Sequence, residues 1–368
     1  MITLTVTTYN KVFVNDATEH ELEKIRRLCM YIVNTTHMKS KEVIDGEEVA
    51  VRSKWDGVVN LFNVKKRYFP VGLLSLVTHY LKKEPIPYRI IDYRLKSVLP
   101  AHQLNYMVPP NNVELRTYQI DGVWIAKEKV NSILHIATGG GKTVMGCEFI
   151  RMTQVNTLIV VSSLTLLNQW KNKLVDYFGQ MPEPIKVGQI GEGVCDIQRI
   201  TIATYQSLTA EPEKFEPLKT FFKSIIYDEC HGVSAKTWKS IANMFENYYS
   251  LGLSATPLSR SDGRNLLVES VCGPVVYHLS CSELTKRGFL SKVKIVVTPL
   301  IHPNKFHYTN YPGVEDQGIV NNLHINIQIV NDAVQCLTHN RLTLILVEKI
   351  EQGENIKQLF KQRLNLDV

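Results

Sequence analysis

The chain has 368 residues, of which 44% are hydrophobic and 21% charged, which is enough for two or three packed domains of a globular protein. No window approaches the roughly eighteen apolar residues of a membrane span, and the first residues, MITLTVTTYN, lack the basic and apolar regions of a signal peptide. These features argue against a membrane protein and predict a soluble, cytoplasmic one.

Seven cysteines are scattered along the chain without a CxxC pair, at positions 29, 147, 195, 230, 272, 281 and 336. An odd number without metal-binding spacing disfavours both a disulfide framework and a zinc ribbon. We therefore expect a reducing compartment.

The net charge of +7 is unevenly distributed, because residues 52–96 contain ten Lys or Arg against three acids. Aromatic residues interleave with these charges, among them Trp55, Tyr68, Phe69, Tyr80 and Tyr88. Basic and aromatic side chains together suit a phosphate backbone and unstacked bases. The alternative is a solvated basic face whose aromatic residues fill a small core, and the sequence leaves both interpretations open.

The first hundred residues predict a small α/β module. Residues 2–7 alternate like a strand, and DATEHELEKIRRLCMYIV (16–33) reads as an amphipathic helix with an Asp/Thr cap and acids in its first turn. WDGVVNLF (55–62) predicts a strand after an Asp-Gly turn, and VGLLSLVTHYLKK (71–83) predicts a second helix after Pro70. We expect an accessory domain at 1–100, then a proline-rich and asparagine-rich linker at 101–112.

From Val113 onward, apolar runs alternate with helical stretches. These runs are SILHIA, NTLIVV, RITIAT, KSIIYDE and YYSLGLSAT. The pattern predicts a parallel sheet covered on both faces, within a domain at 113–284. A second α/β domain is expected at 285–368, with a strand at KIVVTPL, an irregular loop at 301–320, a helix at LHINIQIVNDAVQCLTHN and a strand at LTLILVE.

The stretch HIATGGGKTVMG (135–146) joins an apolar strand to a helix through a glycine-rich loop, made of Thr138, Gly139, Gly140 and Gly141. Glycines let backbone N–H groups converge on a phosphate at a helix N-terminus. Lys142 would reach the β- and γ-phosphates of ATP, and the Thr143 hydroxyl would hold Mg²⁺. Ile136 stands where the general P-loop pattern has its first glycine, so the loop fits the shorter ATGxGKT form.

Asp228 and Glu229 follow the apolar strand KSIIY, about 85 residues after the P-loop. Asp228 can bind Mg²⁺ through water, and Glu229 can orient and deprotonate an attacking water. Alone, such a pair often caps a helix, but its place in the same alternating sheet predicts a catalytic role. His231 has no metal-ligand spacing around it, so we expect a polar coupling role instead.

A third strand end, LGLSATP (251–257), carries two hydroxyl residues, Ser254 and Thr256. Their side chains can exchange hydrogen bonds between an ATP site and a neighbouring element without large motion. We expect both to couple the site to the rest of the protein.

ATGGGKT, DECH and SATP, in this order, resemble motifs I, II and III of superfamily 2 helicases and translocases. LRTYQ (115–119) resembles the adenine-reading Q element, VVSSLTLLNQW motif Ia, TIATYQSL motif Ib, and LTLILVEKIEQG motif IV. The resemblance implies a RecA-like motor lobe with its ATP site at 113–284 and a partial second RecA-like lobe at 285–368. It further implies that Arg116 and Gln119 contact the adenine or its surroundings, and that Ser163 and Thr204 face the nucleic-acid backbone.

The form LRxYQ with DECH looks more like DNA translocases than DEAD-box RNA helicases. In the N-terminal module, WDGVVNLFNVKKRYFPVGLL looks like the accessory domain of bacteriophage UvsW-type helicases. That likeness implies branch migration or unwinding of forks and four-way, Holliday-type junctions in phage recombination and replication, in the host cytoplasm, with unspecified recombination or replication proteins as further partners. Lys65, Lys66 and Arg67 are the expected DNA contacts. The open alternatives are an RNA helicase or RNA-stimulated ATPase, and an ATP-gated clamp without unwinding.

Superfamily 2 motors complete their ATP site with arginines of motif VI, a QxxGRxxR-like segment. After motif IV this chain has only Arg363, without the flanking glycine or a second arginine. We therefore expect a truncated form of a longer helicase, one that binds ATP and DNA at its first lobe but hydrolyses and unwinds poorly.

Overall fold

The computed structural model describes residues 1–8, 10–33, 39–44, 47–52, 57–94, 114–178, 185–232, 235–258, 265–297, 313 and 315–364. It divides into two compact units, Met1–Lys292 and Val293–Val368. The predicted linker at 101–112 lies outside the described residues. In the part of the chain that is described, no helix has the length and apolar character that a membrane crossing requires.

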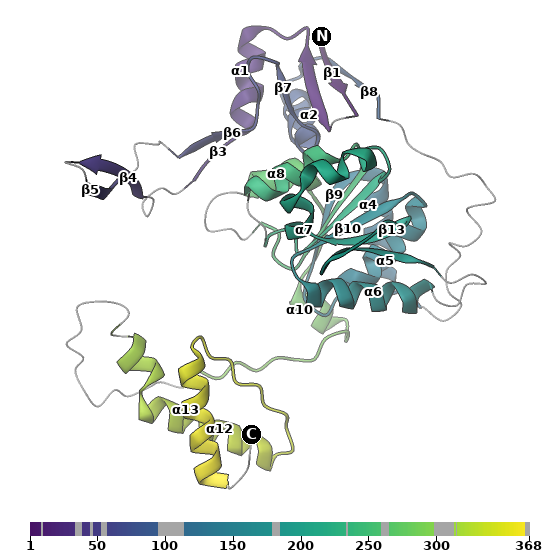
Figure 1. Cartoon of the computed structure of the whole chain (residues 1–368). Helices are drawn as coiled ribbons and strands as arrows, with labels where there is room; N and C mark the ends of the chain where they lie inside the picture. The colour runs from purple at the N-terminus through teal and green to yellow at the C-terminus, as the bar shows by residue number, and fades with distance from the viewer. Residues whose placement is uncertain are drawn as a thin grey trace. The chain divides into compact units, whose positions relative to one another are not determined.

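The first unit begins with a small α/β module (Figure 1). Its strands are β1 (Ile2–Val6), β2 (Lys11–Asn15), β3 (Met30–Ile32), β4 (Lys39–Ile44), β5 (Glu47–Arg52), β6 (Val58–Asn60), β7 (Tyr68–Pro70) and β8 (Tyr88–Asp92). Its helices are α1 (Glu19–Leu28), the 3-10 turn η1 (Val71–Leu73) and α2 (Leu74–Lys83). A four-stranded sheet in the order β7-β2-β1-β8 and the apolar faces of α1 and α2 enclose its core.

Helix α1 starts where the sequence predicts but ends earlier. Thr18 and Glu21 form a reciprocal capping box at its N-terminus, as a Thr with a Glu three residues later favours. The predicted extension to residue 33 is wrong, because the chain leaves the helix at Cys29 and Met30–Ile32 pairs with Val58–Asn60 as antiparallel strands. Pairing with β6 outweighs the local helix tendency of these residues.

The part of the first unit that the sequence predicts to be a motor lobe, called the motor lobe below, is built on an eight-stranded sheet. Its strands are β9 (Asn131–Ile136), β10 (Thr157–Val161), β11 (Val187–Gly191), β12 (Val194–Asp196), β13 (Ile200–Thr204), β14 (Ser224–Asp228), β15 (Tyr249–Ser254) and β16 (Val275–Leu279). The order is β12-β11-β13-β10-β14-β15-β9-β16, and only the β11–β12 pair is antiparallel. The five strands predicted from apolar runs are all confirmed.

Helices cover both faces of this sheet, as the fully apolar strands predict. One face packs against α4 (Thr117–Lys129), α5 (Lys142–Thr153) and α6 (Leu164–Phe178). The other packs against α7 (Tyr205–Ala210), the 3-10 turn η2 (Pro212–Leu218), α8 (Ala235–Met244) and α9 (Asn265–Cys272). Helix α10 (Cys281–Lys286) follows β16.

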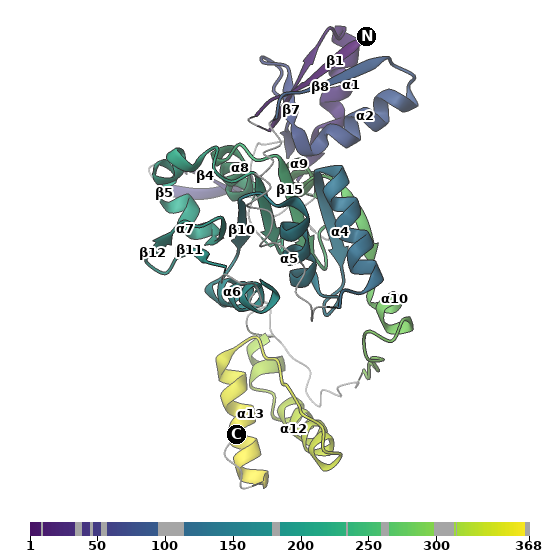
Figure 2. The ribbon, with the colours of Figure 1, turned by 90° about the vertical axis from the view of Figure 1, so that its right-hand side faces the viewer.

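The N-terminal module packs directly on the motor lobe, beside α9 (Figure 2). At Gly72 the contact is backbone to backbone, because a Cβ there would strike the carbonyl groups of Glu269 and Ser270 in α9. The Arg94 side chain is only 6% exposed; its guanidinium pairs with Asp92 at 2.7 Å and donates to Asn131 Oδ1 at 3.0 Å. The module and the lobe therefore form one packed body.

The second unit contains the π-helical turn η3 (Asp316–Val320), α12 (Leu323–Thr338) and α13 (Ile350–Leu364). The predicted helix is confirmed as α12, whereas residues 316–320 are helical and not irregular. The predicted strands are wrong where the structure describes them, because residues 294–297 and 342–347 belong to no helix or strand. Their apolar side chains are solvent-exposed, for example 84% for Ile295 and 83% for Leu344. A strand needs hydrogen-bonded neighbours, and the described part of this unit supplies none.

Candidate ATP site and nucleic-acid contacts

Three predicted site segments meet at one edge of the motor sheet. Strands β14, β15 and β9 are neighbours and parallel, so the residues that follow them lie at the same edge. The glycine-rich loop follows β9, Asp228 and Glu229 close β14, and Ser254 closes β15. In open parallel sheets this carboxyl edge is where ligands bind.

The glycine-rich loop exposes backbone where a phosphate would lie. Gly139 and Gly141 have φ angles of +80° and +84°, a region that only glycine adopts easily. A Cβ at Gly139 would lie 2.8 Å from Leu290, and one at Gly141 would strike the Gln119 amide. Helix α5 starts at Lys142, so its free N–H groups and Lys142 face the same loop. The loop has the form of a phosphate cradle.

Glu229 lies at the centre of the contacts at this edge. Its Oε1 is 3.3 Å from Lys142 Nζ, and its Oε2 is 3.4 Å from both Ser254 Oγ and His231 Nδ1. Ser254 is fully buried, and its hydroxyl lies 2.7 Å from His231 Nδ1. Thr256 is connected to these residues through its backbone N–H, which donates to Ser254 Oγ at 3.0 Å. Four residues predicted separately, Lys142, Glu229, His231 and Ser254, therefore form one connected group.

The backbone at Glu229 has a φ of +45°, which is unfavourable for a residue with a side chain. Such conformations cost about 1–3 kcal/mol and persist where the surroundings enforce them. Here the side chain is held on both sides by Lys142 and Ser254. The strain therefore lies at the predicted catalytic carboxylate.

Asp228 is 5% exposed, and this burial raises the pKa of its carboxyl group. The Trp170 indole N–H donates to Asp228 Oδ2 at 2.8 Å and acts in the opposite direction, lowering that pKa. Trp170 was not predicted as a site residue, although it ends the motif Ia segment VVSSLTLLNQW. A hydroxyl such as that of Thr143 and a carboxylate such as that of Asp228 are hard oxygen donors that suit Mg²⁺.

The Q element lies against the glycine-rich loop. The Gln119 side chain accepts from the Arg116 backbone N–H at 3.0 Å and donates to the Gly140 carbonyl at 3.4 Å. The buried Tyr118 hydroxyl also donates to Gly140, at 2.9 Å, and Arg116 stacks over the Phe289 ring. Tyr118 is a second residue that the sequence did not single out. The adenine contacts of Arg116 and Gln119 stay predictions.

The two hydroxyl residues expected to face nucleic acid both begin helices. Ser163 directly precedes α6, and its Oγ accepts a hydrogen bond from the Leu166 N–H in the first turn. Thr204 directly precedes α7, and its Oγ1 accepts from the Ser207 N–H in the first turn. Thr204 is 4% exposed, whereas Ser163 is half-buried. The Gln206 amide donates to the Ser162 carbonyl at 3.2 Å and joins the two segments. Motifs Ia and Ib therefore form one continuous edge.

The basic turn, defined here as Lys65, Lys66 and Arg67, is exposed between β6 and β7. Arg67 pairs with Glu19 at 2.8 Å, and the side chains of Lys65 and Lys66 are exposed. Arg94, in contrast, is buried, so the basic span 52–96 is partly a structural element. Arg94 is therefore not part of an exposed basic surface, whichever of the two interpretations left open for this span holds.

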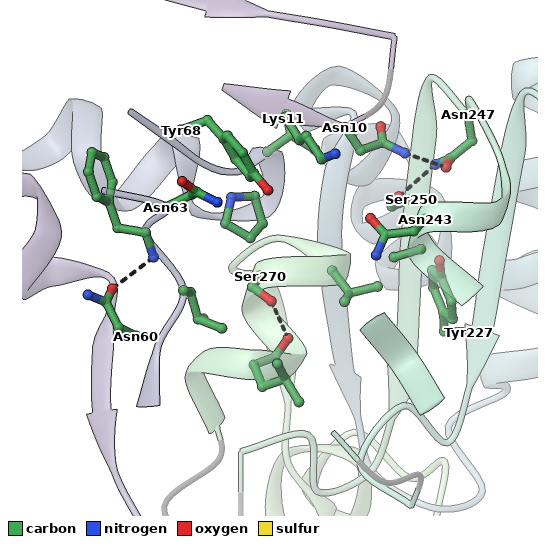
Figure 3. Close-up of a pocket in the computed structure, with 17 residues that line it drawn as sticks. Asn10, Lys11, Asn60, Asn63, Tyr68, Tyr227, Asn243, Asn247, Ser250 and Ser270 are labelled. Atoms are coloured by element: carbon green, nitrogen blue, oxygen red, sulfur yellow. Dashed lines mark hydrogen bonds between the residues drawn. The ribbon is translucent and has the colours of Figure 1, made fainter. Parts of the chain in front are cut away.

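Next to the basic turn, a cavity of about 330 Å³ lies between the N-terminal module and the motor lobe (Figure 3). Its polar lining residues include Asn10, Lys11, Asn60, Asn63, Tyr68, Asn243, Asn247, Ser250 and Ser270. Across it, the Asn10 amide donates to Asn247 Oδ1 at 2.8 Å. Asn63 and Tyr68 flank the basic turn, so the turn is anchored in the same body as the ATP site.

Residues 112–259 match the family described as "Type III restriction enzyme, res subunit". These residues contain all three segments of the sheet edge. The DNA 3'-5' translocase XPB2 of Sulfurisphaera tokodaii is 36% identical over 187 residues, 50% of this chain and 40% of that protein. Putative helicase 22 of Sulfolobus islandicus filamentous virus is 27% identical over 305 residues, 78% of this chain and 49% of that protein. The chain thus spans less than half the length of either relative.

Two solved structures share the fold. The crystal structure of T4 UvsW matches 98% of this chain and 73% of its own, with a TM-score of 0.58 and 17% identity. That of the UvsW helicase from bacteriophage T4 matches 75% of this chain and 99% of its own, with a TM-score of 0.57 and 19% identity. The predicted α/β fold class with a large parallel RecA-like sheet is confirmed.

Proposed function

We propose that this chain is a superfamily 2 helicase or translocase that hydrolyses ATP at the edge formed by β9, β14 and β15 to move along DNA. The observation that carries the proposal is the contact of Lys142 with Glu229 at 3.3 Å, which joins the phosphate loop to the carboxylate pair. Two strands that are far apart in sequence supply the two halves of a phosphoryl-transfer site.

The residues at this edge have complementary roles. Lys142 and the loop Thr138–Gly141 hold the phosphates, and Glu229 accepts a proton from the attacking water. Thr143 and Asp228 would hold Mg²⁺, which neutralises charge on the phosphates when bound. Ser254, His231 and Thr256 pass changes at Glu229 to the neighbouring strand through the hydrogen bonds described above. Arg116 and Gln119 border the adenine.

The proposed substrate is branched DNA, such as forks and four-way junctions. Ser163, with Thr204 beside it, contacts the DNA strand that crosses motifs Ia and Ib. The basic turn on the accessory domain 1–100 binds a second arm of the junction. The DNA 3'-5' translocase XPB2 among the relatives supports DNA as the substrate. The same proposal includes two lobes, at 113–284 and 285–368. It also includes a role in phage recombination or replication, in the host cytoplasm, together with recombination or replication proteins.

The test is ATP turnover with single-stranded, duplex, forked and four-way DNA, each with its RNA counterpart, at one stated salt concentration. We expect the strongest stimulation by the forked and four-way DNA. Stimulation by RNA alone would make the protein an RNA-dependent motor. Tight ATP-dependent DNA binding without turnover would replace the motor with a clamp.

A further inference from the structure

Trp170 connects the helix of motif Ia to the predicted magnesium carboxylate. It lies on α6, is 1% exposed, and its indole N–H donates to Asp228 Oδ2 at 2.8 Å. A buried indole N–H needs a partner, which packing alone could supply from any carbonyl group. Here the partner is the one carboxylate at this edge that is expected to bind a metal ion.

The indole is held on its other side by α5. Gly146 lies one helical turn after Lys142, and a Cβ at this position would strike the Trp170 ring, with Cζ3 3.2 Å away. The ring therefore rests directly on the helix that begins at the phosphate loop. The contact of the ring with Gly146 and the hydrogen bond of its N–H to Asp228 therefore depend on the same position of the indole.

We propose that Trp170 is the positioning residue of the magnesium site, holding the Asp228 carboxylate in the orientation that the metal and its waters require. This inference rests on the nucleotide and magnesium site of the proposed function, not on ATP turnover or DNA binding. A carboxylate can rotate about its last side-chain bond, and a hydrogen bond to one oxygen stops that rotation. Partners of metal ligands commonly change metal affinity by about 10–100-fold when they are removed.

The experiment is Trp170→Phe in the full chain, which removes the N–H donor and keeps an aromatic ring. Electron paramagnetic resonance measures Mn²⁺ binding to the protein with ADP, and a separate titration measures ADP without metal. We expect Mn²⁺ affinity to fall about tenfold. Metal-free ADP affinity should stay within about twofold, because the phosphate loop keeps its own contacts.

Tyr177→Phe is the matched control. Tyr177 is buried on the same helix, and its hydroxyl donates to Glu148 Oε2 at 2.6 Å. This variant also loses a buried hydrogen bond from an aromatic residue of α6, but not one at the metal carboxylate. It should lower the thermal midpoint as Trp170→Phe does and leave Mn²⁺ affinity unchanged.

Unchanged Mn²⁺ affinity in Trp170→Phe would overturn the proposal and make Trp170 a core residue only. Gly146→Ala is a second variant, usable even where Trp170→Phe fails to fold, because it displaces the ring but keeps the N–H. Like Trp170→Phe, it should weaken Mn²⁺ binding. An Mn²⁺ affinity equal to that of the wild-type chain would count against the proposal. If the wild-type chain binds ADP and Mn²⁺ but never turns over ATP, the proposed function fails while this inference stands.

Discussion

At the carboxyl edge of β9, β14 and β15 the side chains of Asp228, Glu229 and Ser254 have fixed partners, whereas the lysines of the basic turn are exposed to solvent. Glu229 contacts Lys142, Ser254 and His231 within 3.4 Å. On the basic turn, the Lys66 backbone N–H is held by Asn63 Oδ1 at 2.9 Å, but both lysine side chains are exposed.

This difference has a physical consequence for how each region works. At the sheet edge, geometry decides activity, since proton transfer and charge stabilisation depend on positions set by buried strands. In the proposed function, the number of charges on the basic turn decides DNA affinity, since exposed lysines bind phosphates by releasing counterions. Single substitutions should therefore have large effects at the edge and graded ones on the turn.

Lys142→Ala should have the largest effect. The variant loses the cation that faces the β- and γ-phosphates, so kcat/KM for ATP should fall by about 10⁴-fold from weaker binding and lost charge stabilisation. Lys214→Ala is the control, because Lys214 forms only an exposed pair with Glu211. Turnover near the wild-type value would remove the sheet edge as the ATP site.

Glu229→Gln separates chemistry from binding. The amide keeps the size of the side chain but cannot accept the proton from water, so kcat should fall by about 10³-fold while ATP binding remains. A quench-flow measurement of one turnover checks the rate, and a binding titration checks the affinity. Loss of ATP binding would show that Glu229 is structural. Glu216→Gln, at an exposed carboxylate, controls for the change in charge.

The pair Lys65→Ala and Lys66→Ala should act on DNA affinity and leave basal ATPase intact. Each phosphate contact contributes about 0.9 to the magnitude of the slope of log affinity against log salt concentration. The slope of the double variant should therefore be smaller in magnitude by about 2. Adding Arg67→Ala should change it by less, because Arg67 is already paired with Glu19. Lys82→Ala with Lys83→Ala removes equal charge from α2, and an equal loss there would deny the basic turn a specific role.

The sequence predicted the sheet edge well because parallel strands bring their ends together whatever lies between them. Glycines, Lys142, Asp228 and Ser254 each follow an apolar run, so local patterns were enough to identify them. Trp170 and Tyr118 were missed because their partners, Asp228 and the Gly140 carbonyl, are set by how helices pack on the sheet. No spacing in the sequence encodes that packing.

The second unit shows where apolar patterns are not enough. Residues 342–347 (LTLILV) are as apolar as β10 (TLIVV), yet they form no strand in the described part of the unit. β10 is buried between β13 and β14, which pair with it on both sides. The pattern predicts which residues can form a strand, whereas the neighbours decide whether one forms. Arg94 gives the same lesson for charge, since a basic residue counted as surface is buried in a docking contact.

The smallest expected effects distinguish the two hydroxyls of motifs Ia and Ib. Thr204→Ala and Ser163→Ala each remove a helix N-cap, which costs about 1 kcal/mol of unfolding free energy. Thr204 is 4% exposed and its hydroxyl also bonds Ser207 Oγ at 2.9 Å, so we expect its loss to leave DNA affinity within about twofold.

Ser163 is more exposed, and its loss should lower DNA affinity by about three- to fivefold, the value of one neutral hydrogen bond. Thermal unfolding and a DNA titration of the same samples measure both quantities, with Thr204→Ser as the variant that keeps the cap. If Thr204→Ala weakens DNA binding as much as Ser163→Ala at equal stability, Thr204 contacts the strand directly. In that case the edge must open at α7 when DNA binds, because the hydroxyl is enclosed in the structure described here.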